Sequence, residues 1–395
     1  MRAIANELLS LLLVKVPYAM NKKIARFLAE NAPATPCLVV DLDVIGKAYD
    51  MLRRYLPIAT VYYAVKANPA PEIVSMLVKK GSNFDVASMG EISLCLGNGA
   101  TPERLSFGNT IKKECDIVAA YAAGVRLFAF DSEAELAKLA RSAPGARVFC
   151  RILVSCEGAD WPLSRKFGCT PELAVKLLCK ARDLGLDPYG VSFHVGSQQT
   201  DPSQWDGAVA SAARMFSLLA ESDINLRMVN IGGGFPARYR TEVSPVEAYA
   251  GAVTAALTRH FGNNIPEIIV EPGRSLVGNA GVIQSEVVLI SDKGDDSGKR
   301  WVYLDAGKFN GLAETMDESI KYRIETPGRG GPSGPVVIAG PTCDSADILY
   351  EKTEYKLPLG LEVGDKVEIL ATGAYTSSYA SVCFNGFEPM RTYCI

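Results

Sequence analysis

The chain has 395 residues with a formal net charge of −3, and 48% of its residues are hydrophobic. This length suits one large domain plus a smaller one, the composition is that of a soluble globular protein, and the charge balance gives no reason to expect a nucleic-acid partner. The ten scattered cysteines contain no Cys-x-x-Cys pair and there are only two histidines, so we expect no zinc site, no disulfide framework and a reducing, cytoplasmic location.

The N-terminal segment contains an apolar stretch at 8–14. It is too short for a membrane span and lacks a small-x-small cleavage site, so we predict an amphipathic helix on the protein surface and no membrane partner. The run at 36–40 is predicted to add a strand to the C-terminal domain described below. Residues 1–40 are therefore expected to pack on that domain as a helix and a strand.

From about residue 60, strand-like and helical patterns alternate. The strand-like runs are 61–65, 83–87, 105–108, 127–130, 148–154, 190–195, 228–231 and 267–270. The segments with helical spacing are 72–80, 90–96, 113–122, 133–140, 171–184, 205–219 and 246–261. Near-continuous apolar strands alternating with helices predict a closed, parallel (β/α)8 barrel of the TIM type over 41–275. An open doubly wound sheet is the alternative, but no dinucleotide fingerprint follows the first strand.

After residue 276 the pattern changes to strands with Gly- and Pro-rich connections. The predicted strands are 282–290, 301–305, 336–339, 366–372 and 380–384, and the predicted exposed loops are 293–299 and 326–335. Because helical spacing is scarce here, residues 276–395 are predicted to form a separate β-rich domain.

A lysine follows the first barrel strand, in the segment Tyr-Ala-Val-Lys-Ala-Asn-Pro at 63–69. The strand-and-turn pattern places Lys66 at the C-terminal end of the strand, where barrel enzymes gather their working groups. An amine beside apolar neighbours is expected to lose its proton more readily than a solvated lysine, and a neutral amine can attack a carbonyl to form a Schiff base. A solvated lysine that caps the strand is the alternative.

Further polar residues and glycines fall at or near the predicted ends of the other strands. They are Asp85, Arg151, His194, Ser197, Gly232, Gly233, Gly234, Glu271 and Arg274. The three glycines expose backbone N–H groups that suit a phosphate, although a plain tight turn is the alternative. Arg274 adds a cation that can fork onto phosphate oxygens.

Glu271 has a different predicted task. A carboxylate opposite a pyridine nitrogen keeps that nitrogen protonated, and the cationic ring then accepts electrons from the bond being broken. An ion pair between Glu271 and Arg274 is the alternative. His194 could stack on such a ring or be a satisfied core residue, and Asp85 by itself is ambiguous. A lysine, a phosphate cradle and this carboxylate in one barrel mouth together predict pyridoxal 5′-phosphate (PLP).

These residues resemble the fold-type III PLP-dependent decarboxylases, and within them the ornithine and ornithine/lysine decarboxylases. The resemblance covers nearly all of residues 36–387. The matching motifs are Tyr-Ala-Val-Lys-Ala-Asn-Pro at 63–69, Phe-Asp-Val-Ala-Ser at 84–88, Lys-Phe-Gly at 166–168, His-Val-Gly-Ser-Gln at 194–198, Ile-Gly-Gly-Gly-Phe-Pro at 231–236, Glu-Pro-Gly-Arg at 271–274, Gly-Pro-Thr-Cys-Asp at 340–344, Gly-Ala-Tyr-Thr at 373–376 and Phe-Asn-Gly-Phe at 384–387.

The resemblance implies a role for each residue of the barrel mouth. Lys66 bonds covalently to the cofactor and Glu271 pairs with the pyridine nitrogen. His194 stacks on the ring, with Asp85 and Arg151 close by. The phosphate is held by four residues, which are Ser197, Gly234, Arg274 and Tyr375.

The resemblance also implies a head-to-tail homodimer in which the partner's Cys343 and the partner's Asp344 complete each active site. Cys343 is expected to protonate the substrate carbon after CO2 has left, because a thiol is mostly protonated near neutral pH. Asp344 is expected to bind the distal ammonium of the substrate. A second acid for this ammonium is expected at Asp317 or Glu314, and Phe384 is expected near the substrate.

The predicted reaction is decarboxylation of L-ornithine to putrescine and CO2, as in polyamine biosynthesis, with L-lysine to cadaverine as a second candidate. Diaminopimelate decarboxylase is the nearest alternative, but a distal carboxylate would be repelled by Asp344 and by an acid at 314 or 317. A non-catalytic regulatory homologue that binds a protein partner is the alternative from another class. The intact Lys66, Glu271 and Cys343 argue against it.

Overall fold

The computed structural model describes residues 21–161, 166–294, 296 and 298–395. The chain divides into two units, Met1–Pro33 and Ala34–Ile395. The described part of the first unit holds helix α2 (Lys22–Asn31), which Asn21 caps by accepting a hydrogen bond from the backbone N–H of Lys23. The helix predicted at 8–14 lies outside the described residues, and its packing stays a prediction. The strand predicted at 36–40 is present as β1 (Cys37–Val40) and pairs with strands of the β-rich part.

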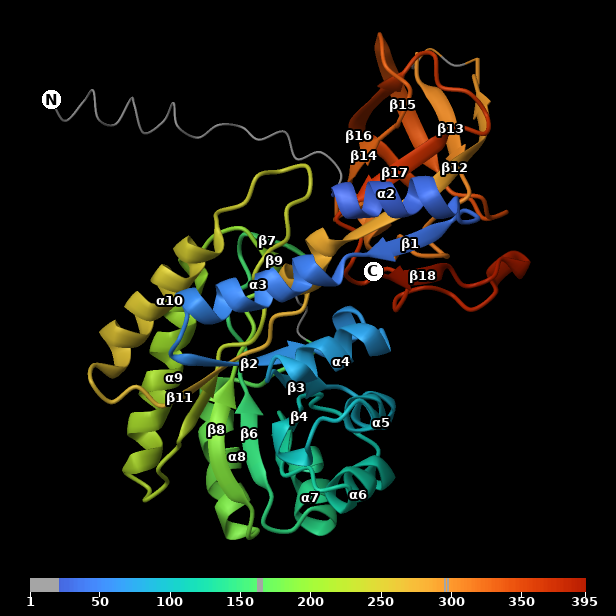
Figure 1. The fold of residues 1–395 in the computed structure, drawn as a ribbon. Helices are drawn as coiled ribbons and strands as arrows, with labels where there is room; N and C mark the ends of the chain where they lie inside the picture. The colour runs from blue at the N-terminus through green and yellow to red at the C-terminus, as the bar shows by residue number, and fades with distance from the viewer. Residues whose placement is uncertain (1–20, 162–165, 295, 297) are drawn as a thin grey trace, which may run out of the picture. The chain divides into compact units, whose positions relative to one another are not determined.

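Eight parallel strands of the second unit close into a barrel in the order β10-β11-β2-β3-β4-β5-β6-β8. These strands are β2 (Ala59–Ala64), β3 (Asn83–Val86), β4 (Leu105–Phe107), β5 (Leu127–Phe130), β6 (Arg147–Arg151), β8 (Asp187–Ser192), β10 (Met228–Asn230) and β11 (Glu267–Val270). Figure 1 shows the barrel in the lower half of the view, from β2 in blue to β8 in green. The predicted (β/α)8 barrel is confirmed.

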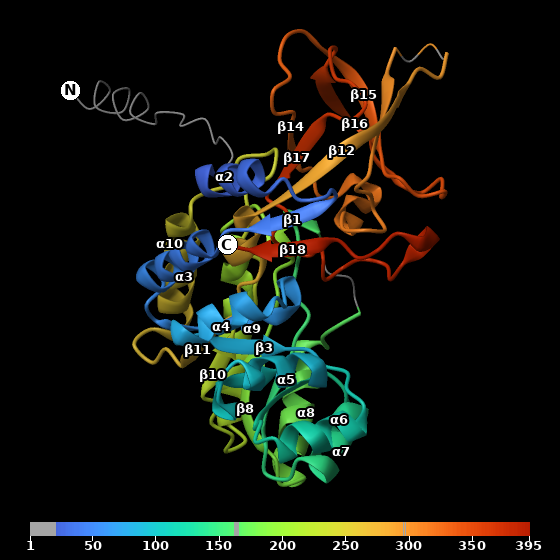
Figure 2. The ribbon, with the colours of Figure 1, turned by 45° about the vertical axis from the view of Figure 1, so that its right-hand side comes forward.

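Helices cover the outside of the barrel (Figure 2). They are α3 (Leu42–Tyr55), α4 (Pro71–Lys79), α5 (Met89–Gly97), α6 (Glu114–Ala122), α7 (Glu133–Ser142), α8 (Pro171–Asp183), α9 (Gln204–Ala220), α10 (Val246–Phe261) and the short α11 (Arg274–Val277). The seven predicted helices are present, but α3 was not predicted. Its buried residues Ile45, Tyr49 and Leu52 have the i, i+4, i+7 spacing of an amphipathic helix, which is the signal that could have found it.

Serine caps explain why two of these helices begin directly after a barrel strand. The Ser88 hydroxyl accepts a hydrogen bond from the backbone N–H of Glu91 at the start of α5, and the Glu91 carboxylate accepts one from the N–H of Ala87. Ser132 caps α7 in the same way, through the N–H of Glu135. Satisfying these backbone donors lets the chain turn from strand to helix within two residues.

The interior of the barrel is filled by side chains. One buried cluster contains Tyr62, Leu127, Ala129, Phe149, Met228 and Ile269. They come from five strands that are not all neighbours in the barrel, so they can meet only in its interior. The barrel interior is therefore a packed core and not a pore. A functional site can form only at the ends of the strands.

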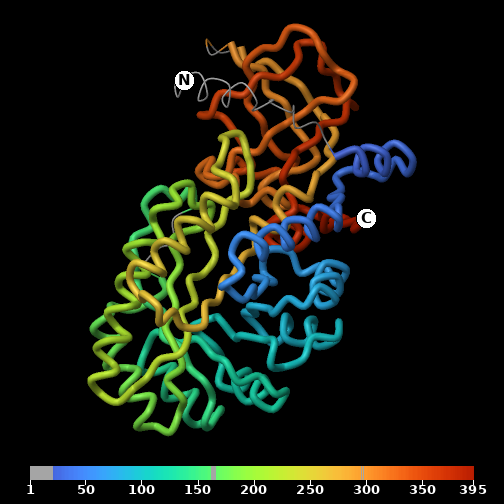
Figure 3. Tube along the Cα trace, turned by 60° about the vertical axis from the view of Figure 1, so that its left-hand side comes forward, coloured from blue at the N-terminus to red at the C-terminus, as the bar shows by residue number. Residues whose placement is uncertain are grey.

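Eight further strands form a mixed sheet in the order β14-β17-β12-β13-β15-β16, with β1 paired to both β12 and β18. They are β1 (Cys37–Val40), β12 (Gly281–Ser291), β13 (Arg300–Leu304), β14 (Arg323–Glu325), β15 (Ser333–Ala339), β16 (Ile348–Pro358), β17 (Lys366–Leu370) and β18 (Arg391–Cys394). Figure 3 shows the chain leaving the barrel and entering this sheet in orange and red. The separate β-rich part is therefore present.

Several predictions within this sheet are wrong. No strand forms at 380–384; the 3-10 turn Phe384–Gly386 lies there instead, because the positive φ values of Cys383 (52°) and Asn385 (53°) are incompatible with an extended strand. The loop predicted at 326–335 ends early, since β15 begins at Ser333. Strands β14, β16 and β18 were not predicted.

Two predictions at the barrel mouth also need correction. Lys66 does not end a strand but lies in the 3-10 turn Val65–Ala67 after β2. Strand β8 stops at Ser192, and Ser197 begins the unpredicted strand β9 (Ser197–Gln199), which pairs with β7 (Ala159–Trp161). In the described part of the chain, no helix combines the length and apolar character needed to cross a bilayer.

Candidate functional site

A cavity of about 360 Å³ opens at the carboxyl ends of the barrel strands. Its lining includes nine residues that the sequence singled out, which are Lys66, Asp85, Arg151, His194, Ser197, Glu271, Arg274, Glu314 and Tyr375. The residues it adds are Ala87, Gly108, Asn109, Thr110, Trp161, Phe167 and Tyr379. Residues more than 300 positions apart in the chain therefore share one site.

Lys66 and Asp85 face each other in this cavity. The Lys66 Nζ lies 3.8 Å from Asp85 Oδ2, and the carboxylate is almost fully buried. Burial by itself lowers the pKa of Lys66, but attraction to Asp85, and then to Tyr375 and Glu271, outweighs it, so the pKa lies above its ordinary value. The expectation that this amine loses its proton readily is therefore wrong for the free lysine, because its neighbours are carboxylates as well as apolar groups.

His194 is held as a neutral ring. Burial, followed by the nearby charges of Arg151 and Lys66, places the pKa of His194 well below its usual range. The Nδ1 atom accepts a hydrogen bond of 3.1 Å from the backbone N–H of Gly196, so the ring proton is on Nε2. A neutral, flat ring with a fixed orientation is available to the cavity.

Packing accounts for the glycine triplet without a ligand. Gly232 and Gly234 have positive φ values of 68° and 99°, and a Cβ on Gly232 would lie 2.4 Å from the carbonyl oxygen of Phe193. A Cβ on Gly233 would lie 2.6 Å from the carbonyl oxygen of Glu271. The triplet therefore lets three loops approach closely beside the cavity, and its predicted contact with a phosphate stays a prediction.

Glu271 is oriented by Asn230, a residue that the sequence analysis missed. The Asn230 side-chain amide donates a 2.5 Å hydrogen bond to Glu271 Oε1 and accepts one of 2.9 Å from the N–H of Gly232. Asn230 is fully buried at the end of β10. A polar amide closing an otherwise apolar strand was the available signal. The alternative ion pair between Glu271 and Arg274 does not form, because Arg274 pairs with Glu314.

Seven predicted site residues are not among those that line the cavity, namely Gly232, Gly233, Gly234, Cys343, Asp344, Asp317 and Phe384. Cys343 is exposed, and its backbone N–H donates a 2.7 Å hydrogen bond to Asn385 Oδ1. The buried carboxylate of Asp347 accepts hydrogen bonds from the N–H and hydroxyl of Thr342. These hydrogen bonds hold the loop that carries Cys343 in a defined conformation.

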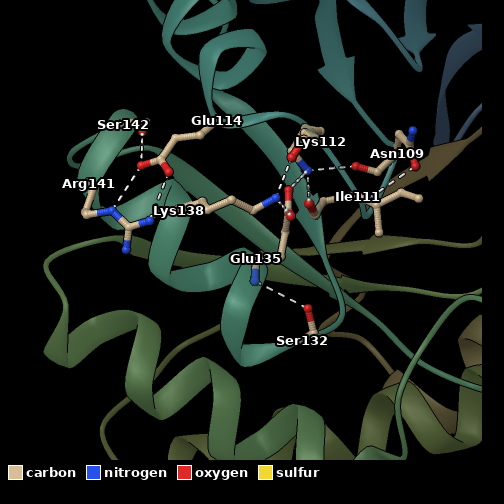
Figure 4. A network of polar contacts seen from close by, with 10 residues as sticks. Asn109, Ile111, Lys112, Glu114, Ser132, Glu135, Lys138, Arg141 and Ser142 are labelled. Carbon is tan, nitrogen blue, oxygen red and sulfur yellow. Dashed lines mark hydrogen bonds and ion pairs between the residues drawn. The ribbon is translucent and has the colours of Figure 1, made fainter.

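A buried ion pair holds one wall of the cavity (Figure 4). The Lys112 side chain is fully buried; its ammonium donates 2.7 Å hydrogen bonds to the carbonyls of Asn109 and Ala129 and lies 3.0 Å from Glu135 Oε1. Burial lowers the pKa of Lys112 to about 8, although Glu135 opposes that change. Because Asn109 lines the cavity, this ammonium fixes the loop after β4.

We expect Glu135→Ala to destabilise the protein by about 3–5 kcal/mol, because it leaves the Lys112 ammonium buried without its carboxylate. Arg141→Ala is the matched control from the same network: its pair with Glu114 is solvent-exposed and should contribute little to stability. Urea unfolding of both variants measures the difference. Equal losses of unfolding free energy in the two variants would show that burial of the Lys112–Glu135 pair does not determine its contribution to stability.

Comparison with known proteins gives three kinds of match. The protein-family model for the pyridoxal-binding domain of the pyridoxal-dependent decarboxylases matches residues 42–278. A lysine/ornithine decarboxylase from Selenomonas ruminantium is 36% identical over 372 residues, which cover 94% of this chain and 92% of the relative.

Two solved structures are similar over nearly the whole chain. Lysine decarboxylase from Selenomonas ruminantium in complex with PLP and cadaverine has a TM-score of 0.85 and 34% identity, covering 96% of this chain and 94% of that chain. The Paramecium bursaria Chlorella virus arginine decarboxylase bound to agmatine has a TM-score of 0.87 and 27% identity, covering 95% of this chain and 100% of that chain.

Proposed function

Since this chain belongs to the pyridoxal-dependent decarboxylases, whose cofactor is PLP, we propose that it decarboxylates a basic amino acid, with L-ornithine giving putrescine and CO2. L-Lysine, giving cadaverine, is the second substrate. The observation that carries the proposal is the single cavity in which an amine, a neutral imidazole, an oriented carboxylate and an arginine meet. All ten cysteines are free, which supports a cytoplasmic location for this activity.

The cavity fits the cofactor by its chemistry. Within the described residues, the buried Asp85 Oδ1 accepts no hydrogen bond, and such an orphaned oxygen suits a site that receives a polar group. Bound there, PLP would supply a ring that takes up the electrons released as CO2 departs.

The chain's own residues then have separate tasks. Lys66 would hold the cofactor covalently, and its proton could pass to Asp85, whose pKa is raised well above its usual range by burial and then by Glu271. Glu271, oriented by Asn230, would keep the pyridine nitrogen protonated. His194 would cover the flat face of the ring.

We propose that the cofactor phosphate lies at the end of the cavity lined by Ser197, Tyr375 and Arg274. The Arg274 guanidinium carbon lies 4.8 Å from the centre of the Tyr375 ring, and its nitrogens contact the Ser197 hydroxyl. These two hydroxyl groups, with backbone N–H groups of the glycine triplet, are the proposed phosphate donors.

We propose a homodimer whose active sites are shared between subunits. In support, the Cys343 side chain is exposed, Asp344 is partly buried, and neither residue lines the cavity that contains Lys66. The partner's Cys343 would protonate the substrate carbon, and the partner's Asp344 would bind the distal ammonium.

Of the two acids proposed near that ammonium, Asp317 is favoured. Both carboxylate oxygens of Glu314 are occupied by Arg274, whereas Asp317 is exposed in the 3-10 turn Ala313–Glu318. Phe384 packs against Phe309 with ring centroids 4.7 Å apart, and this aromatic pair is proposed to contact the aliphatic part of the substrate.

CO2 release from ornithine, lysine, arginine and diaminopimelate, measured in parallel as kcat/KM, tests the substrate. We expect ornithine to be used best and lysine to follow within about 10–200-fold, since one methylene changes transition-state binding by only about 1–3 kcal/mol. Diaminopimelate should be used worst, because its distal carboxylate meets acidic residues. Activity on diaminopimelate equal to or above that on ornithine would overturn the substrate assignment.

A further inference from the structure

The donor groups of Arg274 are used within the chain itself. Its Nη1 atom donates to Glu314 Oε2 (2.7 Å) and to the Tyr239 hydroxyl (2.6 Å). Its Nη2 atom donates to Glu314 Oε1 (2.6 Å) and to the Ser197 hydroxyl (3.2 Å), which also receives the Nε–H at 3.3 Å. A guanidinium has five N–H groups, and these contacts engage all five.

The Arg274–Glu314 pair is buried, with both residues 4% exposed. Arg274 begins α11 after the last barrel strand, whereas Glu314 belongs to the 3-10 turn Ala313–Glu318 of the β-rich segment. The carbonyl oxygen of Glu314 accepts a 3.0 Å hydrogen bond from the N–H of Ile320, so its backbone is held as well. The pair therefore has a fixed geometry in which one full charge neutralises the other.

We propose that Glu314 is the resident counter-ion of Arg274: it keeps the guanidinium paired in the cofactor-free protein, competes with the cofactor phosphate for it, and does not bind the distal ammonium of the substrate. This inference rests on the proposed function, because it assumes that a phosphate enters beside Ser197. A phosphate that enters there shares the Arg274 guanidinium with the Glu314 carboxylate, beside the hydroxyl and N–H donors of the site.

Removal of the Glu314 carboxylate changes both the stability of the protein and its affinity for phosphate. Without the cofactor, a Glu314→Gln variant leaves the buried guanidinium without an anion, which destabilises the protein. With the cofactor, the phosphate supplies the missing negative charge, and repulsion between the phosphate and the carboxylate is gone. Loss of the carboxylate should therefore lower the stability of the cofactor-free protein while strengthening its binding of phosphate groups.

The experiment compares the cofactor-free parent and Glu314→Gln by thermal unfolding, with and without PLP or inorganic phosphate, and measures Kd for PLP by titration. We expect a lower Tm without ligand, a larger rise in Tm with either ligand, and PLP binding at least about tenfold tighter in the variant. The KM for ornithine should stay within about threefold of the parent.

Glu318→Gln is the matched control. Glu318 lies in the same 3-10 turn, but its carboxylate accepts hydrogen bonds from the N–H groups of Glu351, Lys352 and Thr353 and does not line the cavity. This variant should lower Tm without changing the rise in Tm that PLP or phosphate causes. It therefore separates the effect of destabilising the turn from the effect of removing the counter-ion of Arg274.

Two results would overturn the proposal. One is a KM for ornithine raised more than about tenfold with an unchanged Kd for PLP, which would make Glu314 a substrate ligand. The other is weaker PLP binding in Glu314→Gln. The Kd for PLP is measured without any amino acid, so failure of the substrate assignment would be visible separately, in the kcat/KM values of the parent protein.

Discussion

Lys66→Ala is expected to lower decarboxylation by more than about 1,000-fold. Lys66 is the one primary amine among the described residues that line the cavity. Without it, none of the described lining residues offers a primary amine that can condense with an aldehyde carbon. CO2 release from ornithine measures the loss of activity, and the absorbance of the protein measures the loss of covalently held cofactor.

The matched control is Lys66→Arg, which keeps a positive charge beside Asp85 but removes the nucleophilic amine. We expect it to be as inactive as the alanine variant and to lack the cofactor absorbance that borohydride abolishes in the parent. Substantial activity in Lys66→Arg would mean that the positive charge, not a covalent bond, is what Lys66 contributes. A colourless parent that borohydride leaves unchanged would favour the non-catalytic homologue.

Cys343→Ala is expected to lower normal product formation by about 10²–10⁴-fold, the range for removal of a general acid. If active sites are shared, mixing this variant with Lys66→Ala and allowing subunit exchange should restore activity. Half of the dimers would then be mixed, and each mixed dimer would have one intact site and one site lacking both groups. The recovered activity should approach about a quarter of that of the parent.

Two controls accompany this experiment. Mixing the parent with the double variant Lys66→Ala/Cys343→Ala should give mixed dimers without any intact site. The activity of that mixture should therefore come from the remaining parent–parent dimers alone. Cys115→Ala, at another exposed cysteine, should behave as the parent. Full, normal product formation by Cys343→Ala would remove its role as proton donor, and a mixture that stays inactive would place each active site within one subunit.

Local pattern accounts for the parts of the fold that were predicted correctly. The barrel strands are short apolar runs and their helices have regular spacing, so each element could be recognised from its own residues. Parallel strands that alternate with helices have few ways to pack, and closure of eight units into a barrel follows from that restriction. The elements missed in the β-rich part have weaker local signals: in β16, charged residues such as Glu351, Lys352 and Lys356 interrupt the apolar pattern.

The last strand, β18, illustrates the limit of local pattern. Residues Arg391–Cys394 pair in parallel with Cys37–Val40, near the opposite end of the chain. Four residues carry too little information to predict a partner that distant. In Figure 1 this pairing is visible as a red strand beside a blue one.

The sequence by itself determined the barrel, the family resemblance and the residue types that meet at its mouth, because these depend on short motifs and on periodicity. Only the tertiary structure decided how those residues are paired and charged. Glu314 lies against Arg274 and not in the open cavity, Asn230 orients Glu271, and carboxylates raise the pKa of Lys66. Charge, desolvation and hydrogen bonding act over a few ångströms between residues far apart in the chain, and such distances exist only once the chain has folded.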